Sequence, residues 1–110
     1  MSKMQREKGK AFERKVARIL LEHGYDARRG QQYCGASGDA DVVGLDGIHI
    51  ECKAVEKMTL YAWMEQSIHD AREGEIPIVV HKQNRKDILV SMRFEDWLKI
   101  YGKKNEGEPE

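Results

Sequence analysis

The feature that most constrains the fold is a pair of short apolar segments separated by the dipeptide Asp46-Gly47. The first segment covers residues 40–45 and the second covers residues 48–54. Both carry the β-branched residues that favour strands, and an Asp-Gly dipeptide between two such segments is a strong signal for a hairpin. The sequence therefore predicts two strands joined by a tight turn.

The spacing of apolar residues predicts the other elements. Helical spacing indicates a first helix from residue 5 to about residue 23, with Gly24 as its C-terminal stop. A turn and a short exposed strand are expected next, and then a polar loop. The later elements are a helix over about 60–72, strands over 76–80 and 88–92, and a short helix over 94–101. This order predicts one α/β domain over residues 1–102, with a central mixed β-sheet flanked by helices, and a disordered tail over 103–110.

Composition excludes several classes of protein. No segment approaches the roughly 20 apolar residues that span a bilayer, so no membrane partner is expected. The N-terminus is charged and has no apolar signal core, and the two cysteines, Cys34 and Cys52, lack the CxxC spacing. The sequence thus indicates a cytoplasmic protein with reduced thiols.

The charge is distributed unevenly along the chain, although the whole chain is neutral. Residues 1–32 hold nine Lys and Arg against four acids, a net charge of +5, which leaves ten against fifteen, or −5, for residues 33–110. A bound polyanion beside an acidic cation site would require such an asymmetry. A solvated helix face and an acidic tail would explain the charge distribution equally well. The choice between the two explanations therefore depends on the residues that could form an active site.

The second predicted strand carries the most informative residues. Side chains alternate between the faces of a strand, so Cys52 points to the core while Glu51 and Lys53 lie side by side on the other face. The chain has four histidines without metal-ligand spacing, which are interpreted as structural, although His49 shares the face of Glu51. Alone, Glu51 and Lys53 could form only a weak salt bridge at the surface.

The register of the hairpin decides whether Glu51 has an acidic partner. A two-residue turn at Asp46-Gly47 would place Asp41 opposite Cys52. A three-residue loop that begins at Leu45, with Gly47 in a left-handed conformation, places Asp41 opposite Glu51. We predict the second register, since it alone creates a two-carboxylate site.

Two adjacent carboxylates repel one another unless a cation lies between them. Oxygen ligands with room for water suit Mg²⁺ or Mn²⁺, and Lys53 could orient a water molecule or stabilise negative charge. Glu13, on the first helix beside core-facing Phe12, could supply a third carboxylate or simply pair with basic neighbours. Asp39 lies on the same strand face as Asp41 and is the alternative for its role.

These residues resemble the PD-(D/E)XK nuclease superfamily, which places an acid on one strand and E-x-K on the next. Here the pattern is Asp41 followed by Glu51-Cys52-Lys53, with Ala40 in place of the leading proline. The chain most resembles archaeal-type Holliday-junction resolvases and the resolvase-like or VRR-NUC proteins of phages, over roughly residues 5–100. The segments that carry the resemblance are 8–14, 41–43, 51–53 and 74–80.

The resemblance implies a restriction-endonuclease-like core and a Mg²⁺- or Mn²⁺-dependent DNA endonuclease. Glu13, Asp41 and Glu51 would serve the metal with the Cys52 carbonyl, Lys53 would be the catalytic lysine, and Gln66 an accessory polar residue. A four-way junction has two symmetric scissile strands, so a resolvase is expected to be a homodimer. A flap or replication-repair nuclease, a nonspecific nicking enzyme and a non-catalytic DNA-binding phage module are the alternatives.

Candidate DNA contacts lie in the basic N-terminal third and in the polar loop before Asp41. Side chains of Lys and Arg would contact phosphates, polar loop residues would donate hydrogen bonds, and one tyrosine could stack on a splayed base. These residues are Lys8, Lys10, Arg28, Arg29, Gln31 and Tyr33. Nothing resembles a helix-turn-helix or zinc finger, so base-specific recognition is not indicated.

Overall fold

The computed structural model describes residues 2–31 and 40–106. Along the chain the helices and strands are α1 (Lys3–Glu22), β1 (Arg28–Arg29), β2 (Val42–Val43), β3 (Ile48–Lys53), α2 (Leu60–Asp70), β4 (Ile76–His81), β5 (Leu89–Met92) and α3 (Phe94–Glu106). The strands form one sheet in the order β1-β2-β3-β4-β5. Strands β3 and β4 are parallel and connected through α2, whereas the other neighbouring pairs are antiparallel. The predicted α/β fold with a mixed sheet is confirmed.

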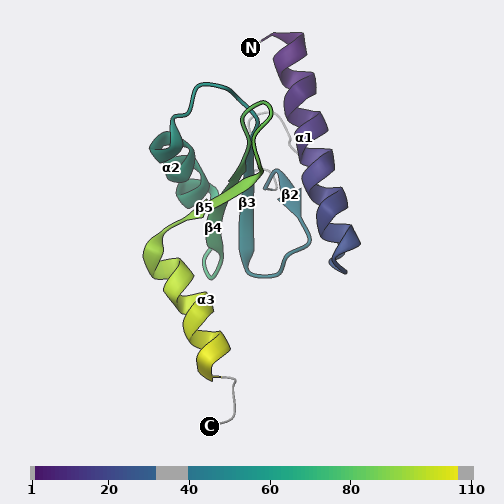
Figure 1. Ribbon diagram of the computed structural model, residues 1–110. Coiled ribbons are helices and arrows are strands. Elements are labelled where there is room, and N and C mark those ends of the chain that lie inside the picture. Colours follow the sequence, from purple (N-terminus) through teal and green to yellow (C-terminus); the bar gives the residue numbers. More distant parts are fainter. Residues whose placement is uncertain (1, 32–39, 107–110) are drawn as a thin grey trace.

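The sheet lies between α1 and α2, each of which covers one face (Figure 1). On one face Ile78 and Val80 of β4 pack with Phe12 and Val16 of α1. On the other face Val79, between them in sequence, packs with Trp63 and Met64 of α2. This alternation is the two-residue period of a strand buried on both faces.

Helix α1 begins at Lys3, two residues before the predicted start, because Ser2 and Gln5 form a capping box. The Ser2 hydroxyl accepts from the Gln5 backbone N–H, and the Gln5 side chain accepts from the Ser2 backbone N–H. At the other end Gly24 has a φ of +95°, as the predicted glycine stop requires. The capping box marks the start of the helix through polar residues, which the spacing of apolar residues could not indicate.

Strand β2 is shorter than the predicted 40–45, because it begins at Val42 and Gly44 ends it. Gly44 has a φ of +117°, and a Cβ there would collide with the Asp26 carbonyl oxygen. The chain at Asp41 nevertheless stays bonded to both neighbours, since its N–H donates to the Ile50 carbonyl and its carbonyl accepts from the Gly30 N–H. Backbone hydrogen bonds on both sides thus hold Asp41 in place beside β3.

Helix α3 is longer than predicted and leaves the body of the protein. It continues to Glu106, so residues 103–106, which the sequence assigned to a disordered tail, are helical. In Figure 1 α3 follows β5 and projects away from the sheet. No helix in the described ranges is long and apolar enough to cross a membrane.

Candidate active site

The central feature of the site is the juxtaposition of Asp41 and Glu51 on neighbouring strands. Val42 pairs with Ile50 in the β2–β3 ladder, so the next residues outward, Asp41 and Glu51, lie opposite one another. Gly47 has a φ of +77°, and the Ile48 N–H donates to the Leu45 carbonyl to close the three-residue loop. The predicted register is therefore the one that the chain adopts.

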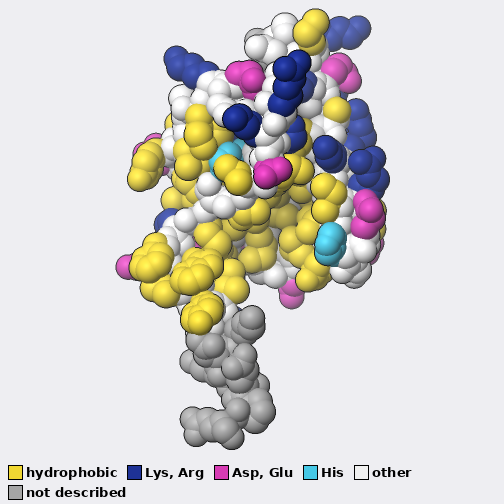
Figure 2. All heavy atoms as spheres, in the orientation of Figure 1, with side chains coloured by type: hydrophobic (Ala, Val, Ile, Leu, Met, Phe, Trp, Pro, Cys, Tyr) yellow, Lys and Arg dark blue, Asp and Glu magenta, His cyan; other side chains and the backbone are white. Residues whose placement is uncertain are grey.

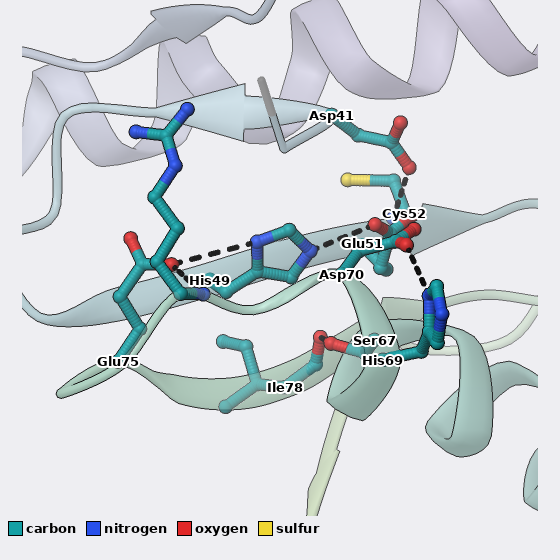
Figure 3. A network of polar contacts seen from close by, with 10 residues as sticks. Asp41, His49, Glu51, Cys52, Ser67, His69, Asp70, Glu75 and Ile78 are labelled. Carbon is teal, nitrogen blue, oxygen red and sulfur yellow. Dashed lines mark hydrogen bonds and ion pairs between the residues drawn. The ribbon is translucent and has the colours of Figure 1, made fainter. Parts of the chain in front are cut away.

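Asp41 is fixed by the strand that carries Glu51. Its Oδ2 accepts a hydrogen bond of 2.8 Å from the Cys52 N–H, and the two carboxylate side chains lie next to one another (Figure 3). Burial, followed by the charge of Glu51, raises the pKa of Asp41 from 3.8 to about 7, against the lowering effect of the Cys52 hydrogen bond. The pair thus resists carrying two negative charges.

Glu51 is deeply buried, with 4% of its surface exposed, and contacts His49. The His49 Nε2 atom lies 2.8 Å from Glu51 Oε1. Burial lowers the pKa of His49, but the hydrogen bond and charge of Glu51, together with Glu75 and Asp70, outweigh it and raise the pKa overall. The sequence analysis treated His49 as structural, and the shared strand face was the only sign of this contact.

Lys53 and Cys52 end strand β3 on opposite faces. Lys53 is half-buried and pairs in register with His81 of β4, on the face of Glu51. Cys52 packs in the core with α1, and burial, then the charge of Asp41, raises the pKa of its thiol. The thiol therefore stays protonated, which leaves the backbone as the part of Cys52 available to the site.

Glu13 lies near the pair but has another partner. Its Oε1 is 3.0 Å from Arg29 Nε, and its negative charge contributes to the raised pKa of Asp41. Within the described residues, no three side chains of His, Cys, Asp or Glu are gathered closely enough to hold an ion. The structure therefore brings Asp41 and Glu51 together and leaves Glu13 bound to Arg29.

Gln66 is exposed on α2. Asp70, one turn further along, lines a hollow together with His49, whereas Tyr61 and Met64 line a groove toward β5. Residues 66 and 70 share a side of the helix because they are four apart. Asp39, the alternative to Asp41, lies outside the described residues.

The donor set fits a small divalent cation. The buried carboxylate of Glu51 and the half-buried carboxylate of Asp41, whose pKa is raised, leave negative charge that a cation would neutralise. Mg²⁺ usually keeps several water ligands and takes one or two carboxylates from the protein. A site with two acids therefore suits this ion without a third side chain.

Comparison with known proteins identifies the family. Residues 4–108 match the model of the family described as "Phage putative PDDEXK endonuclease". The chain belongs to this family. This assignment confirms the resemblance to PD-(D/E)XK nucleases and makes the protein a nuclease.

One solved structure resembles this endonuclease over most of its length. It is Hjc of Archaeoglobus fulgidus, a Holliday junction resolvase from an archaeal hyperthermophile, with 26% sequence identity and a TM-score of 0.57. The match covers 77% of this chain and 72% of that chain. A search of curated proteins found no significant match. The fold of the endonuclease is thus resolvase-like.

Basic side chains of the endonuclease gather over α1 in the upper and right-hand part of Figure 2. Lys10 and Arg28 are exposed, and so is Gln31. Lys8 donates to Asn84 Oδ1 at 3.0 Å, and Arg29 holds Glu13. Tyr33 lies outside the described residues. Lys8 and Lys10 lie on α1 and define its basic side, which Arg29 contacts through Glu13. Arg28 instead lines a hollow with His49 and Asp70.

Proposed function

We propose that this protein is a Mg²⁺- or Mn²⁺-dependent endodeoxyribonuclease that cleaves branched DNA, with a four-way junction as its preferred substrate. The observation that carries the proposal is the Asp41–Glu51 pair, two acids that face one another across β2 and β3. Membership of a family of phage endonucleases and the likeness to a resolvase support the same reading. We place the activity in the cytoplasm, where the buried free thiol of Cys52 would stay reduced.

Asp41 and Glu51 would hold the cation, each by a carboxylate oxygen. The Cys52 carbonyl would add a backbone ligand. Glu13 would assist from α1, either directly or through a water molecule, once its bond with Arg29 opens. The hydrogen bond from the Cys52 N–H to Asp41 keeps one carboxylate oriented before anything binds, which reduces the cost of assembling the site.

When bound, a divalent cation supplies positive charge against the scissile phosphate and makes a nearby water molecule more acidic. Lys53 would orient the attacking water molecule or stabilise the extra negative charge that develops on the phosphate. Gln66, exposed on α2, would hydrogen-bond the nucleic acid or the water near the site. Val79 is fully buried beside Glu51 on the neighbouring strand, and this apolar surrounding would strengthen each of these electrostatic effects.

A twofold homodimer would place two such sites on the two symmetric strands of a junction. Several large apolar side chains are exposed on α3 and on the neighbouring part of the body, at the lower left of Figure 2. We define this apolar face by Tyr61, Val90, Phe94, Trp97 and Tyr101. The rings of Phe94, Trp97 and Tyr101 stack in a row along α3.

The apolar face supports dimer formation because water-exposed aromatic rows are rare on monomers. A groove of about 460 Å³ is lined by residues of α2, β5 and α3, including Tyr61 and Trp97. A second copy of α3 could lay its aromatic row into this groove, with the reciprocal contact following from twofold symmetry. The basic side over α1 would stay free for DNA.

The test is cleavage of a labelled four-way junction, a flap and a matched duplex in Mg²⁺, Mn²⁺ or EDTA. Wild type would be compared with Glu51→Gln and with Glu73→Gln, which changes an exposed acid away from the pair. We expect paired nicks in the junction with either metal, loss in EDTA and in Glu51→Gln, and no change in Glu73→Gln. Cleavage of flaps or duplex in preference to the junction would support the nuclease activity but contradict the four-way junction as the preferred substrate. Binding without cleavage in either metal would reject the catalytic proposal.

A further inference from the structure

His49 lies between two acids that come from different parts of the chain. Its Nε2 is 2.8 Å from Glu51 Oε1 and its Nδ1 is 3.9 Å from Glu75 Oε1. The side chains of His49 and Glu51 are 5% and 6% exposed, so water competes little for these contacts. Figure 3 shows the imidazole ring of His49 between the side chains of Glu51 and Glu75.

The direction of the hydrogen bond follows from the chemistry of the partners. An ionised carboxylate can only accept, so the proton must be on Nε2 and His49 must donate to Glu51. Glu75 Oε1 lies 3.9 Å from the other ring nitrogen, beyond hydrogen-bond distance, so its attraction for the ring is electrostatic and requires an imidazole that carries both protons. The same oxygen accepts from the Arg72 N–H at 2.7 Å. The result is a chain of contacts from the α2–β4 connection, through Glu75 and His49, to Glu51.

We propose that His49 is a positioning residue for the metal-binding carboxylate Glu51, and that Glu75 orients the His49 ring. This inference rests on the proposed function, because it takes Glu51 as a ligand of the cation. His49 would hold one oxygen of Glu51, and the cation would take the place of the hydrogen bond between the Asp41 and Glu51 side chains. In this role His49 would act through Glu51 and would itself contact neither the ion nor the DNA.

The energetic reason is the burial of Glu51 beside Asp41. Without a donor, a buried carboxylate would turn toward any available N–H or take up a proton, and either change would spoil it as a ligand. His49 satisfies one oxygen and fixes the orientation of the other. Partners of this kind, which hold the ligands of a metal, typically matter by about 10–100-fold in metal affinity.

The alternative is that His49 only fills space between β3 and the α2–β4 connection. A leucine has a similar bulk and would preserve that packing, but it has no donor. A glutamine keeps an N–H near the position of Nε2. The two substitutions therefore separate the hydrogen bond from the volume, and a positioning role requires that Gln rescue what Leu loses.

The experiment is calorimetric titration of Mn²⁺ into the full-length protein without DNA, for wild type, His49→Leu and His49→Gln. His69→Gln is the matched control, because His69 is an exposed histidine on α2 that pairs only with Asp70 in the described chain. We expect about 10–100-fold weaker Mn²⁺ binding for His49→Leu, at most a few-fold loss for His49→Gln, and none for His69→Gln. Cleavage by His49→Leu should need correspondingly more Mn²⁺ and regain its rate at saturation.

A second variant covers the case in which His49→Leu does not fold. Glu75 is 28% exposed at its side chain, so Glu75→Gln should fold and weaken Mn²⁺ binding by a smaller factor. Equal Mn²⁺ affinity in wild type, His49→Leu and Glu75→Gln would overturn the positioning role and leave the nuclease proposal intact. Wild type that binds no Mn²⁺ would instead overturn the proposed function.

Discussion

The carboxylate of Asp41 accepts a hydrogen bond from the backbone N–H of Cys52, one residue beyond the acid that it faces, Glu51. The strand that supplies the like charge therefore also supplies the dipole that partly offsets it. Burial and the charge of Glu51 still dominate, and the pKa of Asp41 rises. The site is thus built with an excess of negative charge that a cation can relieve.

This excess predicts a pH-dependent cost to the metal-free fold. Because the pKa of Asp41 is about 7 in the folded chain against 3.8, the folded state keeps a proton that the unfolded state releases between these values. The contribution of the Asp41 carboxyl to the free energy of unfolding is therefore fully present at low pH and is lost as the pH rises through 7. In EDTA, Asp41→Asn should melt several degrees above wild type at pH 8, with the difference shrinking toward pH 5.

Thermal unfolding at a series of pH values measures this difference. Asp46→Asn, at an exposed position in the hairpin loop, is the control and should follow wild type at every pH. A melting difference for Asp41→Asn that does not change between pH 5 and pH 8 would contradict the raised pKa. Added Mn²⁺ should reverse the order, because only wild type gains the ion.

The two glycines of the hairpin should respond differently to alanine. Gly47 has a positive φ but open space around it, so Gly47→Ala should cost about 1–2 kcal/mol of unfolding free energy. Gly44 has a positive φ and also meets the Asp26 backbone, so Gly44→Ala should cost clearly more. Gly9, inside α1 with nothing near it, is the opposite case, and Gly9→Ala should stabilise by up to about 1 kcal/mol.

Urea unfolding of the three variants tests this order. Since Gly47 sets the register that pairs Asp41 with Glu51, Gly47→Ala should also weaken Mn²⁺ binding, whereas Gly9→Ala should leave it unchanged. If Gly44→Ala were as stable as Gly47→Ala, the close approach of β2 to the segment before β1 would not be as tight as described.

The sequence was enough to predict that Asp41 and Glu51 pair, but not the contacts around them or the path of α3. Asp41 and Glu51 could be paired because strand alternation and a left-handed Gly47 leave only two registers to compare. The contact of His49 with Glu75 depends on how the α2–β4 connection folds back, which no local pattern contains. The path of α3 was equally hidden, since Trp97 and Phe94 look the same in sequence whether they are buried in the domain or exposed.

The exposed aromatic row predicts that the dimer depends on α3. Trp97 is 46% exposed in the single chain and stacks on both Phe94 and Tyr101. Trp97→Glu would place a charge in the centre of the proposed interface, and we expect it to weaken dimerisation by at least about tenfold, since central aromatic residues often carry 2 kcal/mol or more. Sedimentation velocity over a range of concentrations measures the change.

The matched control is Tyr25→Glu, because Tyr25 is 50% exposed after α1, outside the apolar face. It should sediment as wild type does. A dimer that survives Trp97→Glu would move the interface elsewhere, and a monomer at all concentrations in wild type would remove the dimer from the proposal.

The basic side over α1 predicts that DNA affinity falls as the salt concentration rises. Substitution of individual lysines tests this prediction. Each phosphate contact that is lost should lower the slope of log affinity against log salt by about 0.9 for duplex arms. The double variant Lys8→Ala with Lys10→Ala should therefore lose the contribution of up to about two phosphate contacts to the slope. It should weaken the binding of junction and duplex alike, because phosphate contacts carry no sequence or branch information.

The control is Lys103→Ala, which changes an exposed lysine on α3 and should leave the slope unchanged. Binding would be measured in EDTA or Ca²⁺ so that no strand is cut. An unchanged slope in the double variant would show that the DNA contacts another face of the protein.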